Sequence, residues 1–158
     1  TWFQGVFGDK LISLLFEPGP GAKPMYLHLL NSVQKQALLN IAYRLSIADG
    51  EDGAEELEVL EDLQLQLGID EAPDMGDVLG ELPTDAFDTG QSRAAAMMEL
   101  LVVTYVDGYL HEAEASLIGE IAEAFEIKQS ALNAMAEWAM DVLDLKRGGD
   151  AVISGNAQ

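Results

Sequence analysis

The organisation of this chain is set by the stretch Leu39-Asn40-Ile41-Ala42-Tyr43-Arg44-Leu45-Ser46-Ile47-Ala48-Asp49-Gly50, an apolar run that ends in an acidic turn. The same pattern closes Val102-Val103-Thr104-Tyr105-Val106-Asp107-Gly108, 58 residues later. A glutamate follows each aspartate by seven residues, at Glu56 and Glu114. Apolar positions beyond the turns match at the same spacing: Leu60 with Ile118, Leu63 with Ile121, Leu67 with Phe125 and Ile69 with Ile127. We therefore predict a duplicated helix–turn–helix unit with an acidic turn in each half.

Helical periodicity dominates the chain, and no apolar–polar alternation runs long enough to indicate a sheet. The pattern predicts helices over residues 31–48, 55–67, 91–106, 112–125 and 131–145. Gly68 is expected to end the second of these helices in the left-handed conformation. Residues 70–88 are expected to be a polar connector with short helical pieces. The predicted fold is all-α, a single compact bundle of about six or seven helices with an internal pseudo-twofold duplication.

Three segments are expected along the chain. Residues 1–24 form an amphipathic helix, with Phe3, Val6, Phe7, Leu11, Leu14 and Leu15 on one side, and a linker containing Pro18-Gly19-Pro20-Gly21. Residues 25–146 form the helical domain, with repeat units of about 25–82 and 83–146. Residues 147–158 form a flexible tail. The N-terminal helix is expected to pack on the bundle; the alternative is an anchor on a membrane or a partner.

The composition narrows the range of partners. A formal net charge of −20 over 158 residues excludes nucleic acid as a binding partner, because a phosphate backbone is bound by Lys and Arg. The same charge argues against an anionic membrane surface. The chain has no cysteine, so disulfides, thiolate metal sites and thiol redox chemistry are excluded. No apolar run is long enough to span a membrane and no signal peptide is recognisable, so a cytoplasmic protein is expected.

The acidic turns admit a structural and a chemical interpretation. In the structural interpretation, the glycine adopts a left-handed backbone conformation without steric strain, and the glutamate complements the dipole of the following helix. As chemistry, the candidate metal ligands are Asp49, Glu56, Asp107 and Glu114. Oxygen ligands favour Ca²⁺, Mg²⁺ or Mn²⁺; His111 occurs in the second turn only. The turns are not EF-hand loops, because Ala54 and Leu60 stand where that loop, counted from Asp49, needs glycine and glutamate.

On these residues the chain resembles the tellurite-resistance TerB family, which includes the related N-terminal domain of the DjlA co-chaperone. The resemblance covers about residues 25–146 and rests on the two Asp-Gly…Glu patterns that follow apolar helices. It implies an all-helical, pseudo-twofold domain without enzymatic activity, associated with tellurite and chemical stress. It also implies a suspected metal-binding role for the four acidic positions. This chain departs from the family pattern in its first turn, which is crowded with Glu51, Asp52 and Glu55.

Two functions follow from the sequence. The first is a divalent-cation-binding domain of the stress response, acting through its two turns. The second is a metal-free adaptor whose acidic surface docks a basic protein partner; from Leu45 to Ser92 the chain has no Lys or Arg but 15 Asp or Glu.

An enzyme is not expected, since no nucleophile–base pattern is present. A protein partner is expected in either case, and membrane association only through that partner or the N-terminal helix. Tellurite itself is not expected as a ligand, because the net charge repels an oxyanion.

Overall fold

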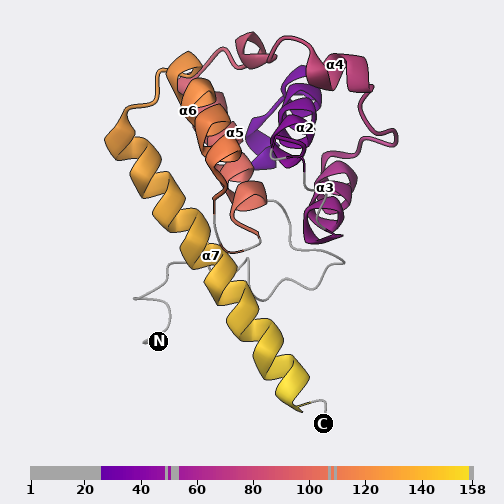
Figure 1. The fold of residues 1–158 in the computed structure, drawn as a ribbon, viewed down its shortest axis with the longest axis vertical. Helices are drawn as coiled ribbons and strands as arrows, with labels where there is room; N and C mark the ends of the chain where they lie inside the picture. The colour runs from indigo at the N-terminus through magenta and orange to yellow at the C-terminus, as the bar shows by residue number, and fades with distance from the viewer. Residues whose placement is uncertain (1–25, 49, 51–53, 107, 109, 157–158) are drawn as a thin grey trace.

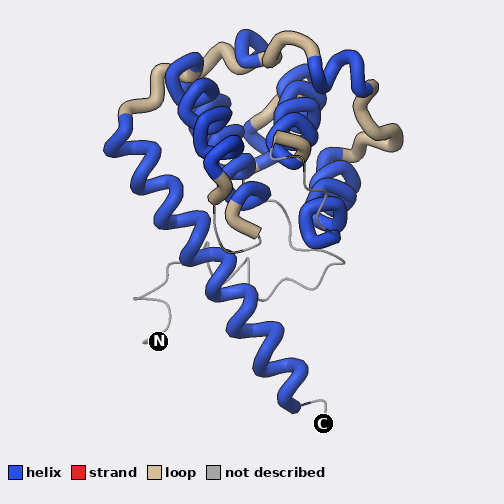
Figure 2. Tube along the Cα trace, in the orientation of Figure 1, coloured by secondary structure: helices blue, strands red, loops and turns tan. Residues whose placement is uncertain are grey.

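The computed structural model describes residues 26–48, 50, 54–106, 108 and 110–156 (Figure 1). Along these residues every regular element is a helix, as Figure 2 shows. In chain order the elements are η1 (Leu27–Leu29), α2 (Ser32–Ser46), α3 (Ala54–Leu67), α4 (Met75–Leu79), η2 (Thr84–Ala86), α5 (Gly90–Thr104), α6 (Glu112–Ala124) and α7 (Gln129–Asn156). The prediction of an all-α bundle is confirmed. The short elements α4 and η2 lie in the predicted connector.

Helices α2 and α5 begin with the same cap at positions 58 residues apart. The amide of Gln34 donates to the side chain of Asn31 at 2.9 Å, and the Asn31 amide donates to the Gln34 side chain at 3.0 Å. Thr89 and Ser92 exchange the equivalent pair of hydrogen bonds, at 3.2 and 3.0 Å. Each pair is a capping box, which satisfies two amides that the first helical turn leaves without partners.

Helices α3 and α6 also end in the same way, at positions 58 residues apart. The amide of Ile69 donates to the carbonyl of Gln64 at 3.2 Å, and Ile127 donates to Ala122 at 2.9 Å. The residue before each donor is left-handed, Gly68 with φ +69° and Glu126 with φ +57°. These are Schellman closures, and the predicted cap at Gly68 is confirmed. The two halves thus share helix starts and helix ends at one spacing, and internal duplication remains our interpretation of that agreement.

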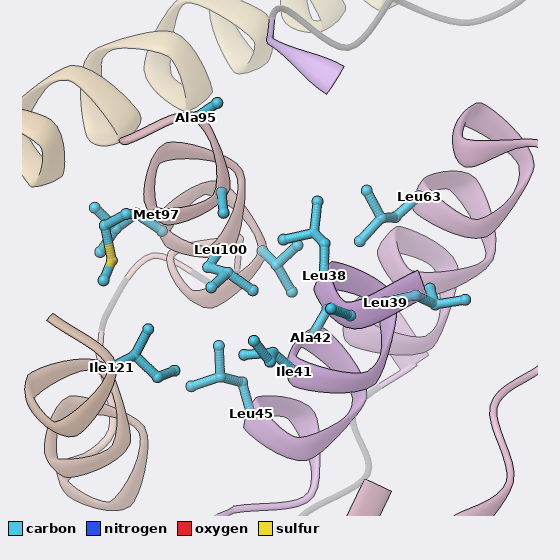
Figure 3. Close-up of a cluster of buried hydrophobic side chains, with 14 of the residues drawn as sticks. Leu38, Leu39, Ile41, Ala42, Leu45, Leu63, Ala95, Met97, Leu100 and Ile121 are labelled. Atoms are coloured by element: carbon cyan, nitrogen blue, oxygen red, sulfur yellow. The ribbon is translucent and has the colours of Figure 1, made fainter. Parts of the chain in front are cut away.

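One core holds the four helices of the two halves together. Helices α2 and α5 pack against each other, and α3 and α6 contribute side chains to the same cluster. Figure 3 shows this cluster, in which most of the labelled side chains are fully buried: Leu38, Leu39, Ile41, Ala42, Leu45, Leu63, Ala95, Met97, Leu100 and Ile121. Phe87 and Phe125, from the connector and the end of α6, meet edge to face with ring centroids 5.2 Å apart. A single buried cluster of this kind is what makes the bundle one domain.

The last helix is longer than the sequence predicts. A helix was expected to end near residue 145 and a flexible tail to begin at 147, but α7 continues to Asn156. The predicted end of the helix at residue 145 is therefore wrong. Gly148 and Gly149 each cost about 1 kcal/mol relative to alanine in a helix, which does not break it, and no proline follows them. In addition, Arg147 ties the helix to the bundle, as described below.

Glu99 of α5 anchors the first described residue of the chain. Its carboxylate accepts a hydrogen bond of 3.2 Å from the amide of Tyr26. Burial raises the pKa of Glu99, and the bond from the Tyr26 amide opposes that shift in part. Because the pKa of the folded state is raised, the stability that this group contributes is fully present below the ordinary carboxyl pKa and is lost as the pH rises through the raised value.

The variant Glu99→Gln is therefore expected to be more stable than the parent chain at neutral pH and no more stable at acidic pH. Glutamine keeps an oxygen for the Tyr26 amide but carries no charge to desolvate. Urea unfolding at the two pH values measures the difference, with Glu123→Gln, at an exposed site on α6, as the matched control. A stability difference that is the same at both pH values would contradict the assignment.

Candidate functional site

The two acidic turns occupy matching places in the fold. The first turn (residues 47–53) joins α2 to α3, and the second turn (residues 105–111) joins α5 to α6. Asp49 and Asp107, the predicted aspartate ligands, lie outside the described residues, as do Glu51 and Asp52. Gly50 and Gly108 are left-handed, with φ +75° and +101°. The Gly50 amide donates to the carbonyl of Ile47 at 3.2 Å, and the Gly108 amide to that of Tyr105 at 2.9 Å. Both turns therefore need glycine at this position.

The two predicted glutamate ligands are buried. Glu56 is 7% exposed and Glu114 is 3% exposed. Each stands at the third position of its helix, where the free amides and the helix dipole favour a negative charge. The carboxylate of Glu114 accepts a hydrogen bond of 3.0 Å from the amide of His111. Glu56 accepts a hydrogen bond of 3.4 Å from the hydroxyl of Ser46, the last residue of α2. The first turn thus brings a carboxylate of α3 against the end of α2.

Ser46 is a site residue that sequence reasoning missed. It is buried, and the position 58 residues later holds Thr104, which is also buried. The two hydroxyls behave differently, because Thr104 donates to the carbonyl of Leu100 within its own helix. The hydroxyl of Ser46 thus bonds to the glutamate of the first turn, whereas the hydroxyl of Thr104 bonds to the backbone of α5. A hydroxyl residue at the end of both apolar runs was the signal that could have identified the position.

Arg147 of α7 lies at the second turn. Its guanidinium donates to the carbonyl of Val106 at 2.8 Å and pairs with Asp144 at 3.3 Å. A Cβ placed on Gly108 would lie 3.9 Å from the same guanidinium. A cation at this point compensates the negative end of the α5 dipole and satisfies a carbonyl beyond the helix end. Sequence reasoning placed Arg147 in a tail, since its partner is 41 residues away.

Arg44, the basic residue nearest to the first turn along the chain, bonds to another part of the fold. Arg44, in the last turn of α2, donates to the carbonyls of Val78 and Gly80 at 2.9 and 3.1 Å and so holds α4 against α2. Tyr43 of α2 donates a hydrogen bond of 3.3 Å to Gln64 of α3, and its pKa is raised by partial burial and by the nearby charge of Glu61. The two turns therefore differ in their basic contacts: the guanidinium of Arg147 bonds to a carbonyl of the second turn, whereas that of Arg44 bonds to carbonyls of Val78 and Gly80.

The described residues do not form a complete metal site by themselves. Among them, no group of three or more His, Asp or Glu side chains lies close enough to hold a metal ion. A cation at either turn would therefore need Asp49 or Asp107 in addition to the buried glutamate and backbone carbonyls, the ligands that hard cations prefer.

Comparisons of the chain with protein-family models, with curated proteins and with solved structures found no match. Within the described part of the chain, every helix is too short or too polar to cross a bilayer.

Proposed function

We propose that this chain is a non-enzymatic, TerB-like domain of a chemical stress response that binds one divalent cation at its first turn. The observation that carries the proposal is Glu56, a carboxylate only 7% exposed, which is held against Ser46 beside the most acidic segment of the chain. Eight Asp or Glu stand between Asp49 and Asp62. A bound cation offsets the repulsion among such charges and the cost of burying one of them.

The first turn is the better cation site of the two. At the second turn the guanidinium of Arg147 already bonds to the carbonyl of Val106 at 2.8 Å, so a metal ion there would meet a like charge. At the first turn Arg44 is directed to α4 instead. We therefore propose a strong site at Asp49 and Glu56 and a weaker one at Asp107 and Glu114.

The chemistry of the available ligands selects a hard cation. Carboxylates, a serine hydroxyl and turn carbonyls are oxygen donors, which suit Ca²⁺, Mg²⁺ or Mn²⁺. Ca²⁺ is the leading candidate, since a turn that mixes carbonyl and carboxylate oxygens tolerates its irregular geometry better than the strict octahedron of Mg²⁺. A role in tellurite or wider chemical stress rests on the resemblance to the TerB family, and with this net charge it would be indirect.

Titration calorimetry of the chelator-treated full chain with Ca²⁺, Mg²⁺ and Mn²⁺, at fixed ionic strength, tests the proposal. We expect one strong site per chain, which Glu56→Gln and Asp49→Asn remove and the matched variants Glu114→Gln and Asp107→Asn leave intact. Arg147→Gln is expected to strengthen the second, weaker site, because it removes the competing charge. Heats that are unchanged in Glu56→Gln and Asp49→Asn would contradict a site at the first turn.

A second function, the metal-free adaptor, is favoured by the exposed charge on α3 and the connector. Among the side chains that the structure describes there, ten acidic ones are exposed: Glu58, Glu61, Asp62, Asp70, Glu71, Asp74, Asp77, Glu81, Asp85 and Asp88. Such a surface attracts a basic protein and speeds its association. If this is the function, divalent and monovalent salts should act on the protein equally at equal ionic strength, and Glu56→Gln should not alter the response.

A further inference from the structure

Within the described part of the chain, no element buries the apolar side chains of the outer part of α7 (residues 144–155). Every residue from Asp144 to Gly155 is exposed. Figure 1 shows α7 leaving the other coloured helices and running toward the C-terminus by itself. Leu145, Val152 and Ile153 are 51%, 63% and 71% exposed. A Cβ built on Gly148 or Gly149 would meet no atom of the described residues within 4 Å, so these residues leave the surface between the exposed side chains uncovered.

These exposed side chains continue a face of α7 that is covered nearer the bundle. Met135 and Trp138 pack against the core, and Leu145 and Val152 follow Trp138 by seven and fourteen residues. At 3.6 residues per turn this spacing keeps all four on one side of the helix. We call the face formed by Met135, Trp138, Val142, Leu145 and Val152 the α7 stripe. Its first members are covered and its last members are not.

The point where the described chain begins lies on this stripe. The ring of Tyr26 meets the ring of Trp138 with centroids 5.7 Å apart, and the Tyr26 amide is bonded to Glu99. Twenty-five residues precede Tyr26, and their sequence places six apolar side chains on one side of a predicted helix: Phe3, Val6, Phe7, Leu11, Leu14 and Leu15. An amphipathic segment is therefore tethered beside an apolar stripe that needs a cover.

The tether is long enough. Nine residues, 17–25, separate this segment from Tyr26, and at about 3.3 Å per residue they reach about 30 Å when extended. Val152 lies fourteen residues beyond Trp138, which is about 21 Å along a helix at 1.5 Å per residue. The pattern over residues 2–16 also spans about the length of the exposed part of the stripe.

We propose that residues 2–16 dock as an amphipathic helix on the exposed part of the α7 stripe, within the same chain. The short tether raises the local concentration of this segment far above that of any free partner, which favours it over a second copy of the chain. Docking removes Leu145, Val152 and the apolar side of the segment from water, and each fully buried side chain of this kind contributes about 1.5–3 kcal/mol.

Paramagnetic relaxation in the full chain tests this docking. The chain has no cysteine, so Ser13→Cys on the polar side of the segment provides a single attachment point for a nitroxide label. We expect the label to broaden the amide signals of residues 144–156 at least several-fold more than those of α3, independently of protein concentration. Adding Val152→Asp should abolish this broadening, whereas adding Leu65→Asp, at an exposed site on α3, should not.

A sample that mixes two differently labelled forms of the protein shows whether the α7 stripe is covered by the chain's own N-terminal segment or by a second copy of the chain. In this sample, ¹⁵N-labelled protein without a nitroxide is combined with nitroxide-labelled protein of natural isotope abundance. The ¹⁵N-labelled protein should show no broadening over residues 144–156. Broadening in that sample would assign the stripe to a second copy and overturn the proposal. Signals of residues 144–156 that stay sharp in both samples would overturn it as well, because the segment would then not lie on the stripe.

Discussion

Leu100→Ala is expected to lower the free energy of unfolding by about 3–5 kcal/mol, the range for a leucine whose removal leaves a cavity in a well-packed core. Leu100 is fully buried and comes from α5, at the centre of the cluster that joins the two halves. Figure 3 shows it among side chains of α2, α5 and α6. The position 58 residues earlier is the fully buried Ala42, so at these matched positions one half of the chain supplies the large side chain and the other the small one.

Urea unfolding followed by circular dichroism measures this effect. Leu65→Ala is the matched control, because Leu65 on α3 is 78% exposed and its truncation should change stability by no more than about 0.5 kcal/mol. Similar losses in the two variants, or a loss below about 1 kcal/mol in Leu100→Ala, would mean that the halves are not joined through this cluster.

Saturating divalent cation is expected to raise the free energy of unfolding by about 2.7 kcal/mol when its free concentration is 100 times the Kd. For a chain of this size, that gain corresponds to a rise in Tm of about 5–10 °C. The gain arises because the folded chain alone holds Glu56 at the first turn, against the end of α2. In the unfolded chain the same carboxylates are separated and bind the cation weakly.

The variants separate this effect from charge screening. Glu56→Gln should lose nearly all of the cation-dependent gain in Tm, while Glu114→Gln, at the equally buried matching position, should keep most of it. Thermal unfolding of chelator-treated protein at fixed ionic strength gives the comparison. An equal rise in Tm for the parent and both variants would indicate screened surface charge and would favour the adaptor function.

Local signals in the sequence predicted the helix ends well. Asn31 and Gly68 act at short range, through amides within a few residues, so their roles can be read from their positions. The end of α7 was missed because Arg147 bonds to Val106, 41 residues away, and such a contact depends on how helices pack. The 58-residue spacing of the two acidic turns could likewise be read from the sequence.

The burial of the candidate ligands was less predictable. An acidic residue in the first turn of a helix is common on protein surfaces, and sequence alone gives no reason why Glu56 and Glu114 should be buried. Glu56 is buried where the first turn of α3 meets the end of α2, at Ser46, and a contact between residues of two helices depends on how those helices pack. The difference between the two turns depends on α7, which has no counterpart of the same length in the first half.

The most direct test of a cation site at the first turn is the broadening of amide signals by substoichiometric Mn²⁺ in ¹⁵N-labelled, chelator-treated protein. A paramagnetic ion broadens the signals nearest to it, so the account predicts that Ser46, Gly50 and Glu56 broaden first while Gly108 remains sharp. Broadening that begins instead at exposed acids such as Asp70 and Glu71, or equally at Gly50 and Gly108, would contradict a specific site at the first turn.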